Sequence, residues 1–345
     1  MLERLRPDLL HIQYQTGAYG MHPAVNLLPW RLRSRTGPAC PHLAVTFHDL
    51  REPYLFPKAG PLRRWITHRL AADCDLVVAT NPDDLAALHR SGIAACHIPI
   101  SSNIAALPPP GYEREPWRSR LGVRPGDVLV AYFGLLSPNK GVDLLLDALS
   151  DLARKPDQEP DQSQSREYPA GPRFLLLLIG GDATSPRDRA YADQVFATIE
   201  RLWWRERVII TGHVDAVTVS AHLLAADCVA LPFRGGASFR SGSLLAALSH
   251  GTPVVTTVEP GGRRWGTEDA NIRLVDGEHA LLVAPDDRRS LSQALRRLAQ
   301  DPALRKRLSA GALQVAAHFT WETITRQHEQ AYYRLLNRIS PQVTP

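Results

Sequence analysis

A glycine-rich stretch in the second half of the chain combines residue types that bind anions. It follows an apolar run at 228–231, precedes a helical pattern, and reads Pro232-Phe233-Arg234-Gly235-Gly236-Ala237-Ser238-Phe239-Arg240-Ser241-Gly242-Ser243. A strand, a glycine-rich loop and a helix that begins with small hydroxylated residues leave free backbone N–H groups at the positive end of the helix dipole. Arg240 adds a planar fork of donors that suits phosphate oxygens. We expect an anion site here; the alternative is a plain serine N-cap with tight glycine turns.

Lys140 occupies a second segment of the same kind. The sequence Phe133-Gly134-Leu135-Leu136-Ser137-Pro138-Asn139-Lys140-Gly141-Val142 joins a strand pattern to a helix pattern. Lysine occurs only at positions 58, 140, 155 and 306, and this one falls where the carboxyl end of a strand should open on a ligand crevice. A point cation there could hold a diphosphate. The alternative is a solvated lysine near a helix start.

These loops require α/β domains to position them. Short aliphatic or β-branched runs alternate with longer amphipathic stretches, a pattern typical of βαβ units around a parallel sheet. The expected strands are 9–13, 42–47, 74–80, 128–133, 173–179, 208–211, 228–231, 254–257 and 281–284. The expected helices are 61–72, 82–90, 142–153, 191–205, 217–224 and 242–250, followed by three helical segments over 288–338 that break at Asp301-Pro302 and Phe319-Thr320.

A proline-rich segment divides the chain. Leu107-Pro108-Pro109-Pro110-Gly111 cannot continue a helix or a central strand, and such segments act as stiff spacers. We expect a first domain over 1–107, a hinge over 108–120, a second domain over 121–320 and a returning helix over 321–345. Residues 155–172 are rich in Pro, Asp, Gln and Ser, which indicates an exposed insertion. Two such domains should enclose a cleft that holds the ligand.

Short motifs in a fixed order resemble the donor-binding half of family-4 glycosyltransferases of GT-B fold, the glycosyl transferases group 1. The second-domain motifs are Gly134 with Lys140-Gly141-Val142-Asp143, Leu178-Ile179-Gly180-Gly181-Asp182, Thr211-Gly212-His213-Val214, Ala226-Asp227-Cys228-Val229-Ala230-Leu231-Pro232 and His250-Gly251-Thr252-Pro253-Val254. The first third resembles the acceptor-binding domain of that family through Pro7-Asp8-Leu9-Leu10-His11, Val45-Thr46-Phe47-His48-Asp49 and Ala72-Asp73-Cys74-Asp75-Leu76. The resemblance is strongest over 120–336.

The resemblance implies a transferase of two Rossmann-like domains. It would move a sugar from a nucleotide-diphosphate sugar to an acceptor, with retention of configuration and without metal or other cofactor. The implied catalytic residues are Lys140 and His48, the latter matching a family histidine that positions the reacting sugar, and we add Arg240 to them from its place in the glycine-rich loop. The implied donor-binding residues are Gly134, Leu135, Gly212, His213, Val214, Ser238, Phe239, Ser241, Gly242 and Ser243.

Several positions depart from the family pattern. Its Glu-x7-Glu motif aligns on Ser238 and Ala246, and its phosphate-loop arginine aligns on Leu135. We expect Arg240 to supply the missing charge. The family also has a strand and glycine-rich loop before the segment that begins here at Leu9. A start codon assigned too late is the expected reason, and loss of the first βα unit is the alternative.

Composition excludes several classes of protein. The chain has 345 residues, a formal charge of +5 and 22% charged residues, but its arginine pairs are scattered without interleaved aromatics, which does not favour nucleic-acid binding. The cysteines at 40, 74, 96 and 228 have no metal-ligand or redox spacing. Asp73-Cys74-Asp75 spells Asp-x-Asp, yet it leads into a buried strand, so we attribute it to chance. No apolar run approaches the roughly 20 residues of a membrane span, and residues 1–7 offer neither the apolar core nor the cleavage site of a secretory signal, so we do not expect export.

The expected protein is a cytoplasmic transferase of polysaccharide or glycoconjugate synthesis, with a sugar or lipid-linked acceptor and a peripheral contact with anionic membrane. Two other functions remain open. A sugar-nucleotide epimerase of GT-B fold would act on the donor without an acceptor. A degenerate transferase would scaffold a polysaccharide-assembly complex, because Ser238, Ala246 and Leu135 remove three expected contacts.

Overall fold

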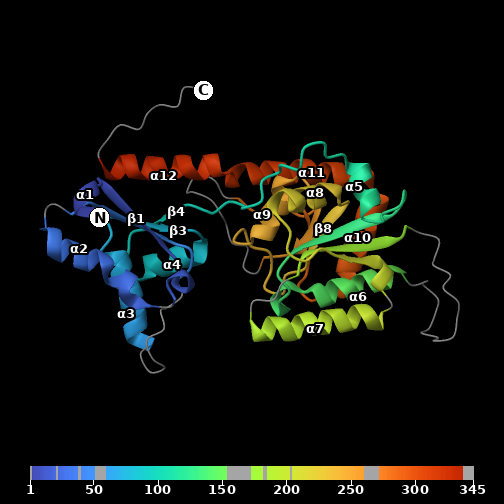
Figure 1. The fold of residues 1–345 in the computed structure, drawn as a ribbon, viewed down its shortest axis with the longest axis horizontal. Coiled ribbons are helices and arrows are strands. Elements are labelled where there is room, and N and C mark those ends of the chain that lie inside the picture. The colour runs from blue at the N-terminus through green and yellow to red at the C-terminus, as the bar shows by residue number, and fades with distance from the viewer. Residues whose placement is uncertain are drawn as a thin grey trace. The chain divides into compact units, whose positions relative to one another are not determined.

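The computed structural model describes residues 2–20, 22–37, 40–50, 60–153, 172–181, 185–202, 204–259 and 272–336. The chain forms two compact units. Unit 1 comprises Met1–Ser101, Arg264–Ile272 and Phe319–Pro345, and unit 2 comprises Ser102–Arg263 and Arg273–His318. Each unit contains its own parallel sheet, so the predicted α/β class is confirmed (Figure 1). No described helix is both long and apolar enough to cross a bilayer.

Unit 1 is built on a four-stranded parallel sheet in the order β1-β2-β3-β4. Its strands are β1 (Leu9–Tyr14), β2 (His42–Phe47), β3 (Leu76–Ala79) and β4 (Cys96–His97). Its helices are α1 (Leu2–Leu5), α2 (Leu28–Thr36), α3 (Gly60–Ala72), α4 (Pro82–Arg90) and α12 (Trp321–Leu335), with 3-10 turns at Thr16–Tyr19 and Pro23–Leu27. Tyr14 and Phe47 are fully buried and pack in a tilted edge contact. Ile324 of α12 packs on Val78 and Ile98, which ties the last helix to this unit.

Unit 2 is built on a six-stranded parallel sheet in the order β10-β9-β8-β5-β6-β7. Its strands are β5 (Val128–Gly134), β6 (Phe174–Gly180), β7 (Val208–Ile210), β8 (Cys228–Leu231), β9 (Val254–Thr257) and β10 (Leu281–Val283). Its helices are α5 (Arg114–Arg120), α6 (Val142–Ala153), α7 (Pro186–Arg201), α8 (Ala216–Ala225), α9 (Gly242–Ser249), α10 (Arg288–Gln300) and α11 (Pro302–Ala316), with 3-10 turns at Pro138–Lys140, Arg205–Arg207 and Ala317–Phe319. Helices α6 and α7 lie on one face, and α8, α9 and α11 on the other (Figure 1).

The chain reverses direction along the sheet between β7 and β8. Sequence order runs outward from β5 through β6 to β7, and then returns to β8 on the other side of β5. Strands β5 and β6 are apolar without alternation because helices cover both faces of the sheet. Loops after β5 and β8 therefore meet at the carboxyl edge, where open α/β sheets bind ligands.

The predicted strands are all present, and most boundaries agree within two residues. The predicted helix over 191–205 is wrong in extent, because α7 begins at Pro186, where Ser185 caps the helix by accepting from the Asp188 N–H at 3.1 Å. Helix α2 and the short strand β4 were not predicted. The insertion predicted over 155–172 lies outside the described residues except for residue 172.

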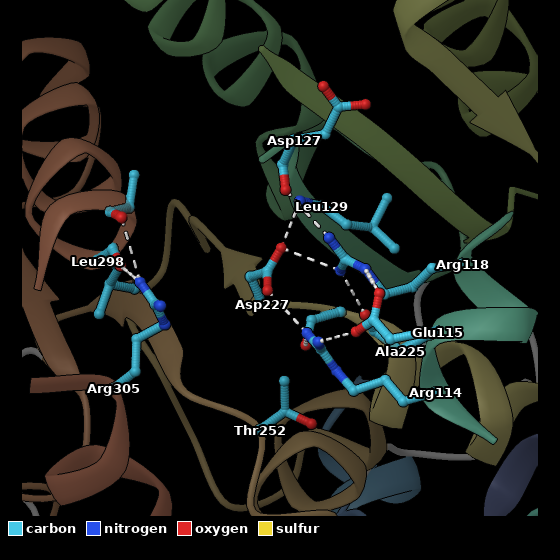
Figure 2. A network of polar contacts seen from close by, with 12 residues as sticks. Arg114, Glu115, Arg118, Asp127, Leu129, Ala225, Asp227, Thr252, Leu298 and Arg305 are labelled. Carbon is cyan, nitrogen blue, oxygen red and sulfur yellow. Dashed lines mark hydrogen bonds and ion pairs between the residues drawn. The ribbon is translucent and has the colours of Figure 1, made fainter. Parts of the chain in front are cut away.

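The predicted hinge over 108–120 requires correction in its second half. Residues 114–120 form α5, and unit 2 begins at Ser102. Figure 2 shows how Arg118 fixes α5 to the sheet: its guanidinium donates to Asp227 Oδ2 at 3.0 Å and to the Ala225 carbonyl at 2.8 Å. Arg114 donates to the other Asp227 oxygen at 2.7 Å, and the Leu129 N–H donates to Oδ2. Helix α5 is thus a fixed part of unit 2.

Candidate functional site

The glycine-rich loop between β8 and α9 has a defined path. The Ala237 N–H donates to the Thr257 carbonyl at 3.1 Å, and the Thr257 hydroxyl donates to the Phe233 carbonyl at 2.7 Å. The Ser241 N–H donates to the Ser238 carbonyl at 2.9 Å, which turns the chain into α9. The end of β9 therefore holds the loop from one side, and the loop delivers Ser238 and Ser241 to the carboxyl edge of the sheet.

Helix α9 presents unused donors at its N-terminus. Ser241 is the N-cap residue, but its side chain makes no capping hydrogen bond and instead lies 3.0 Å from the hydroxyl of Ser243. Across the described ranges, no acceptor pairs with the backbone N–H groups of Gly242, Ser243 and Leu244. The alternative of an ordinary serine cap does not match this geometry. The helix end can accept an anion through these amides.

Lys140 lies at the end of the 3-10 turn Pro138–Lys140, just after β5. Its Nζ lies 4.6 Å from the centre of the Phe233 ring, a cation–π contact. Burial lowers the pKa of Lys140 because the ammonium loses part of its hydration. In the part of the chain that the structure describes, no carboxylate forms an ion pair with this amine. A partly desolvated cation without a carboxylate is suited to bind an external anion.

Gly141 sets how closely the Lys140 turn approaches the glycine-rich loop. Its φ is +69°, and a Cβ atom added there would lie 2.2 Å from the Pro232 carbonyl oxygen. Only glycine tolerates both the left-handed backbone and this contact. The Lys140 turn and the glycine-rich loop are thus packed directly against each other.

Arg240 is exposed, and its guanidinium has no hydrogen-bond or ion-pair partner among the described residues. Its backbone N–H donates to the Ser238 hydroxyl at 3.3 Å. Together with Lys140 it lines a hollow of about 490 Å³. The lining residues are Asn139, Lys140, Phe233, Arg234, Gly235, Gly236, Ser238, Arg240 and Ser241, and none of them is acidic. The hollow is therefore electropositive.

Arg234 is a residue of this hollow to which the sequence analysis gave no role. Its three nitrogens donate to Asp286 Oδ1, Asp143 Oδ2 and the Pro138 carbonyl, each at 2.7 Å. Hydrogen bonds to these carboxylates raise the pKa of Arg234 above its ordinary value. The Asp143 pKa is lowered although burial opposes this, because Arg234 and Tyr191 both donate to the carboxylate. The guanidinium of Arg234 is thus engaged with the protein itself.

The glycines at the ends of β5, β6 and β7 converge beside α9. A methyl group at Gly134 would lie 3.8 Å from the Ser243 hydroxyl, and the Gly181 N–H donates to the Gly134 carbonyl at 3.1 Å. The Gly180 N–H donates to the Gly212 carbonyl at 3.2 Å. The structure therefore brings the predicted residues Gly134, Ser243 and Gly212 to one edge of the sheet.

The remaining predicted donor residues occupy different positions. Leu135, His213 and Val214 do not line the hollow; Leu135 and His213 are exposed, and Val214 is half-buried. Phe239 is buried and lines a second, smaller hollow of about 210 Å³, which shares Ser238 with the first.

His48 belongs to unit 1, where it follows β2. Its Nε2 lies 2.8 Å from Gln13 Oε1, so this nitrogen carries the proton and donates. The pKa of His48 is lowered mainly by burial, and His328 adds to the effect. His11 lies nearby on β1, with Nε2 2.8 Å from the Thr46 hydroxyl and Nδ1 hydrogen-bonded to the Tyr332 hydroxyl. Burial thus favours the neutral form of the His48 imidazole.

Asp73 and Asp75 of the Asp-x-Asp segment serve the fold of unit 1. Asp75 pairs with Arg33 at 2.7 Å and accepts from the Leu43 N–H at 2.8 Å, while Asp73 pairs with Arg69 at 2.6 Å. Within the described residues, no group of three or more His, Cys, Asp or Glu side chains is arranged to hold a metal ion.

Comparison with known proteins identifies the family. Residues 127–301 match the family model described as Glycosyl transferases group 1, and residues 1–101 match the Glycosyl transferase 4-like domain. Mannosylfructose-phosphate synthase of Agrobacterium fabrum is 29% identical over 269 residues, which is 74% of this chain and 52% of that protein. D-inositol 3-phosphate glycosyltransferase of Kineococcus radiotolerans is 30% identical over 241 residues, which is 69% of this chain and 51% of that protein. The chain spans about half the length of these relatives.

Solved structures show the same architecture. Sucrose-phosphate synthase from Thermosynechococcus elongatus aligns with a TM-score of 0.67 at 21% identity, over 97% of this chain and 75% of that one. Anabaena Alr3699/HepE in complex with UDP aligns with a TM-score of 0.70 at 19% identity, over 96% of this chain and 80% of that one. These likenesses confirm the GT-B fold. Since the group 1 model alone spans just over half of the residues, the chain belongs to the glycosyl transferases group 1 family.

Proposed function

We propose that this protein transfers a sugar from a nucleotide-diphosphate sugar to a hydroxyl-bearing acceptor. The observation that carries the proposal is the electropositive hollow of unit 2, where Lys140 and Arg240 lack carboxylate partners within the described residues. The free amides of Gly242, Ser243 and Leu244 add donors from the end of α9. The oxygens of a diphosphate can pair with both cations and accept hydrogen bonds from the helix N-terminus at the same time. Family membership supports transfer as the reaction.

In the proposed reaction, the bond between the anomeric carbon and the diphosphate oxygen breaks, and the nucleoside diphosphate leaves with the electron pair. The acceptor hydroxyl forms the new bond to the anomeric carbon, and its proton passes to the leaving phosphate oxygen. Lys140, Arg240 and the α9 amides stabilise the charge that develops on the diphosphate, as donors fixed before reaction do. We propose retention of configuration and no metal requirement, with His48 positioning the reacting sugar.

The donor is proposed as a nucleoside diphosphate sugar without a specified base or sugar. Ser238 lines the hollow where the family pattern has glutamate, and Ala246 is fully buried in α9 where the pattern has the second glutamate. Neither residue supplies a carboxylate for hydroxyl groups of a ribose or hexose. UDP is the first candidate, because the structure of the Anabaena relative was determined in complex with it.

A thermal-shift panel of nucleoside diphosphates tests donor binding. A ligand present at 100 times its dissociation constant adds about 2.7 kcal/mol of stability, which raises the melting temperature measurably. We expect at least one nucleoside diphosphate to stabilise the protein and its sugar conjugate to be consumed only when an acceptor is present. Consumption of the conjugate alone would favour an epimerase or hydrolase.

The same panel tests a non-catalytic scaffold, which the missing carboxylates at Ser238 and Ala246 favour. A scaffold that has lost the nucleotide site would give no shift with any nucleotide, whereas a scaffold that keeps the site would bind without reacting. Binding without turnover, across a range of sugar and lipid-linked acceptors, would also support it over transfer.

We also propose that unit 1 contacts anionic membrane at the inner face, in a cytoplasmic protein. Helices α2 and α3 contain no acidic residue, and α3 exposes Leu62 and Trp65 to 45% and 54%. Basic helices with exposed aromatic and aliphatic side chains bind anionic interfaces. Sedimentation with anionic vesicles should deplete the protein from solution, and Trp65→Ser should reduce this. Sedimentation that is insensitive to salt and lipid charge would contradict the proposal.

A further inference from the structure

We infer that Arg234 is a positioning residue that holds the Lys140 turn in place for the diphosphate, rather than a ligand of the diphosphate. The inference rests on the proposed function of the hollow. Arg234 is part of the glycine-rich loop, and every nitrogen of its guanidinium is directed at the segments on either side of Lys140 or at Asp286.

The contacts of Arg234 surround Lys140 in sequence. The Pro138 carbonyl precedes Lys140 by two residues, and the Asp143 carboxylate follows it by three. The backbone contributes as well, because the Arg234 N–H donates to the Asn139 carbonyl at 3.0 Å. One residue thus fixes both ends of the turn whose tip carries the lysine.

Of the partners of Arg234, Asp143 is itself held by a second hydrogen bond. Tyr191 of α7 donates to Asp143 Oδ1 at 2.5 Å, on the oxygen that Arg234 does not use. Asp286 lies after β10 and has a positive φ of 57°, a conformation rare for residues other than glycine. The set formed by Arg234, Asp143, Asp286 and Tyr191, here termed the Arg234 clamp, therefore joins the segments after β5, β8 and β10 to α7.

Charge separates the Arg234 clamp from the phosphate site. Two carboxylates lie 2.7 Å from the guanidinium, so a diphosphate that approached Arg234 would also approach both acids. Arg240 lies in the same loop without such partners among the described residues. Arg234 thus holds the turn in place, whereas Arg240 is available to bind the diphosphate.

Substitution of Asp286 changes the UDP affinity in opposite directions depending on whether Arg234 positions Lys140 or binds the diphosphate itself. If Arg234 positions Lys140, Asp286→Asn loosens the clamp and weakens UDP binding, and Arg234→Met weakens it at least about tenfold. Arg234→Lys should bind UDP little better than Arg234→Met, since one ammonium cannot reproduce the three hydrogen bonds of the planar guanidinium. If Arg234 instead binds phosphate, Asp286→Asn removes a competing carboxylate and tightens UDP binding. Tighter binding would overturn the inference.

Hydrogen exchange gives a readout that needs no ligand. In Arg234→Met, we expect faster exchange confined to peptides that cover 134–145 and 232–241. The matched control is Arg288→Met, because Arg288 of α10 pairs with Asp151 at the far end of α6 at 3.0 Å and does not line the hollow. This variant should leave exchange of the Lys140 turn and the UDP affinity unchanged.

The two readouts separate failure of the inference from failure of the proposed function. If the wild-type protein binds no nucleoside diphosphate, the donor site is refuted, and the exchange data alone decide whether the clamp orders the turn. If Arg234→Met weakens UDP binding while exchange over 134–145 stays unchanged, Arg234 contacts the diphosphate and the inference is wrong.

Discussion

At the scale of single residues, the hollow of unit 2 contains three cations in different states. Arg234 forms ion pairs with two carboxylates that offset its charge. Lys140 is partly desolvated against the Phe233 ring, and Arg240 is exposed. Composition cannot reveal these differences. They decide which side chain is free to bind an anion and which serves the fold.

Arg240→Ala should weaken nucleotide binding without destabilising the protein. A charge-assisted hydrogen bond is worth about 1.5–3 kcal/mol, so we expect the dissociation constant of UDP to rise by about tenfold or more. The side chain is exposed and makes no hydrogen bond or ion pair with a described residue, so the melting temperature of the apo protein should change little. Isothermal titration calorimetry measures the affinity.

The control for Arg240 is Arg296→Ala. Arg296 is an exposed arginine of α10 outside the hollow, so this variant removes the same formal charge from unit 2. Equal losses of affinity in the two variants would mean that only net charge matters, and Arg240 would lose its assigned role.

Gly141→Ala should cost about 3 kcal/mol or more of unfolding free energy, because the new Cβ would collide with the Pro232 carbonyl oxygen. The control Gly122→Ala measures the cost of the left-handed backbone alone, because Gly122 has a φ of +75° and no atom lies within 4 Å of an added Cβ. This substitution should lower the unfolding free energy by only about 1–2 kcal/mol. Urea unfolding of both variants measures the difference. Equal costs would show that the loop yields to the added methyl group.

At the scale of elements, helix α12 is joined to unit 1 by a histidine that resists protonation. The Tyr332 hydroxyl of α12 is hydrogen-bonded to His11 Nδ1, and Thr46 Oγ1 lies 2.8 Å from Nε2. Burial first, and then His328 and His48, lower the pKa of His11 to about 4. The unfolded chain has the ordinary value near 6.5, so between these values it binds more protons than the folded protein does.

Acid should therefore weaken unit 1. The contribution of His11 to stability is complete above about pH 6.5 and is lost as the pH falls toward about 4, by roughly 1–2 kcal/mol. His11→Gln removes this titration, so the variant should be less stable than the wild type at pH 7.5, with a smaller difference at pH 5. Hydrogen exchange of peptides from α12 and β1 at the two pH values measures it. A difference that grows toward acid would contradict the assignment.

The sequence predicted elements where local signals agree with burial. Strands β2, β8 and β9 were predicted to the residue, because β8 and β9 are unbroken apolar or β-branched runs that are fully buried, and β2 is buried from its second residue onward. Asp301 divides α10 from α11 by capping the second helix through the Leu304 N–H at 2.8 Å, and Asp-Pro is visible in the sequence. Helix α5 was missed because its stability comes from Asp227, more than a hundred residues away in the chain.

The sequence predicted where the candidate residues lie in the fold, while their roles stay predictions. Strand, glycine turn and helix start place Lys140 after β5 and Ser241 before α9, as the structure has them, since these positions follow from topology. The assignment of Arg234 depends on Asp286, which is 52 residues distant, so no local pattern could have found it. Phe239 was predicted to bind the donor but faces the other hollow, because the loop turns between Ser238 and Ser241.

At the scale of the whole molecule, the chain divides into two units that each contain a separate sheet and core. Helix α5 is the first helix of unit 2, and the ion pair between Arg118 and Asp227 attaches it to the residue before β8 (Figure 2). The side chains of Arg118 and Asp227 are only 7% and 17% exposed. Loss of one partner from such a pair leaves a buried charge uncompensated, which is far more costly than loss of a surface pair.

Arg118→Met should therefore destabilise unit 2 selectively, by about 3 kcal/mol. We expect faster hydrogen exchange in α5, α8 and the strands β5 and β8, with unit 1 peptides unchanged. The matched control is Arg205→Met, since Arg205 pairs with Glu200 at 3.0 Å with 82% and 58% of the side chains exposed, and should cost no more than about 0.5 kcal/mol. If hydrogen exchange in Arg118→Met rises equally in both units, the two units unfold together and the predicted selectivity is wrong. Two units with separate cores would not pass the loss of the Arg118 ion pair from α5 to β1.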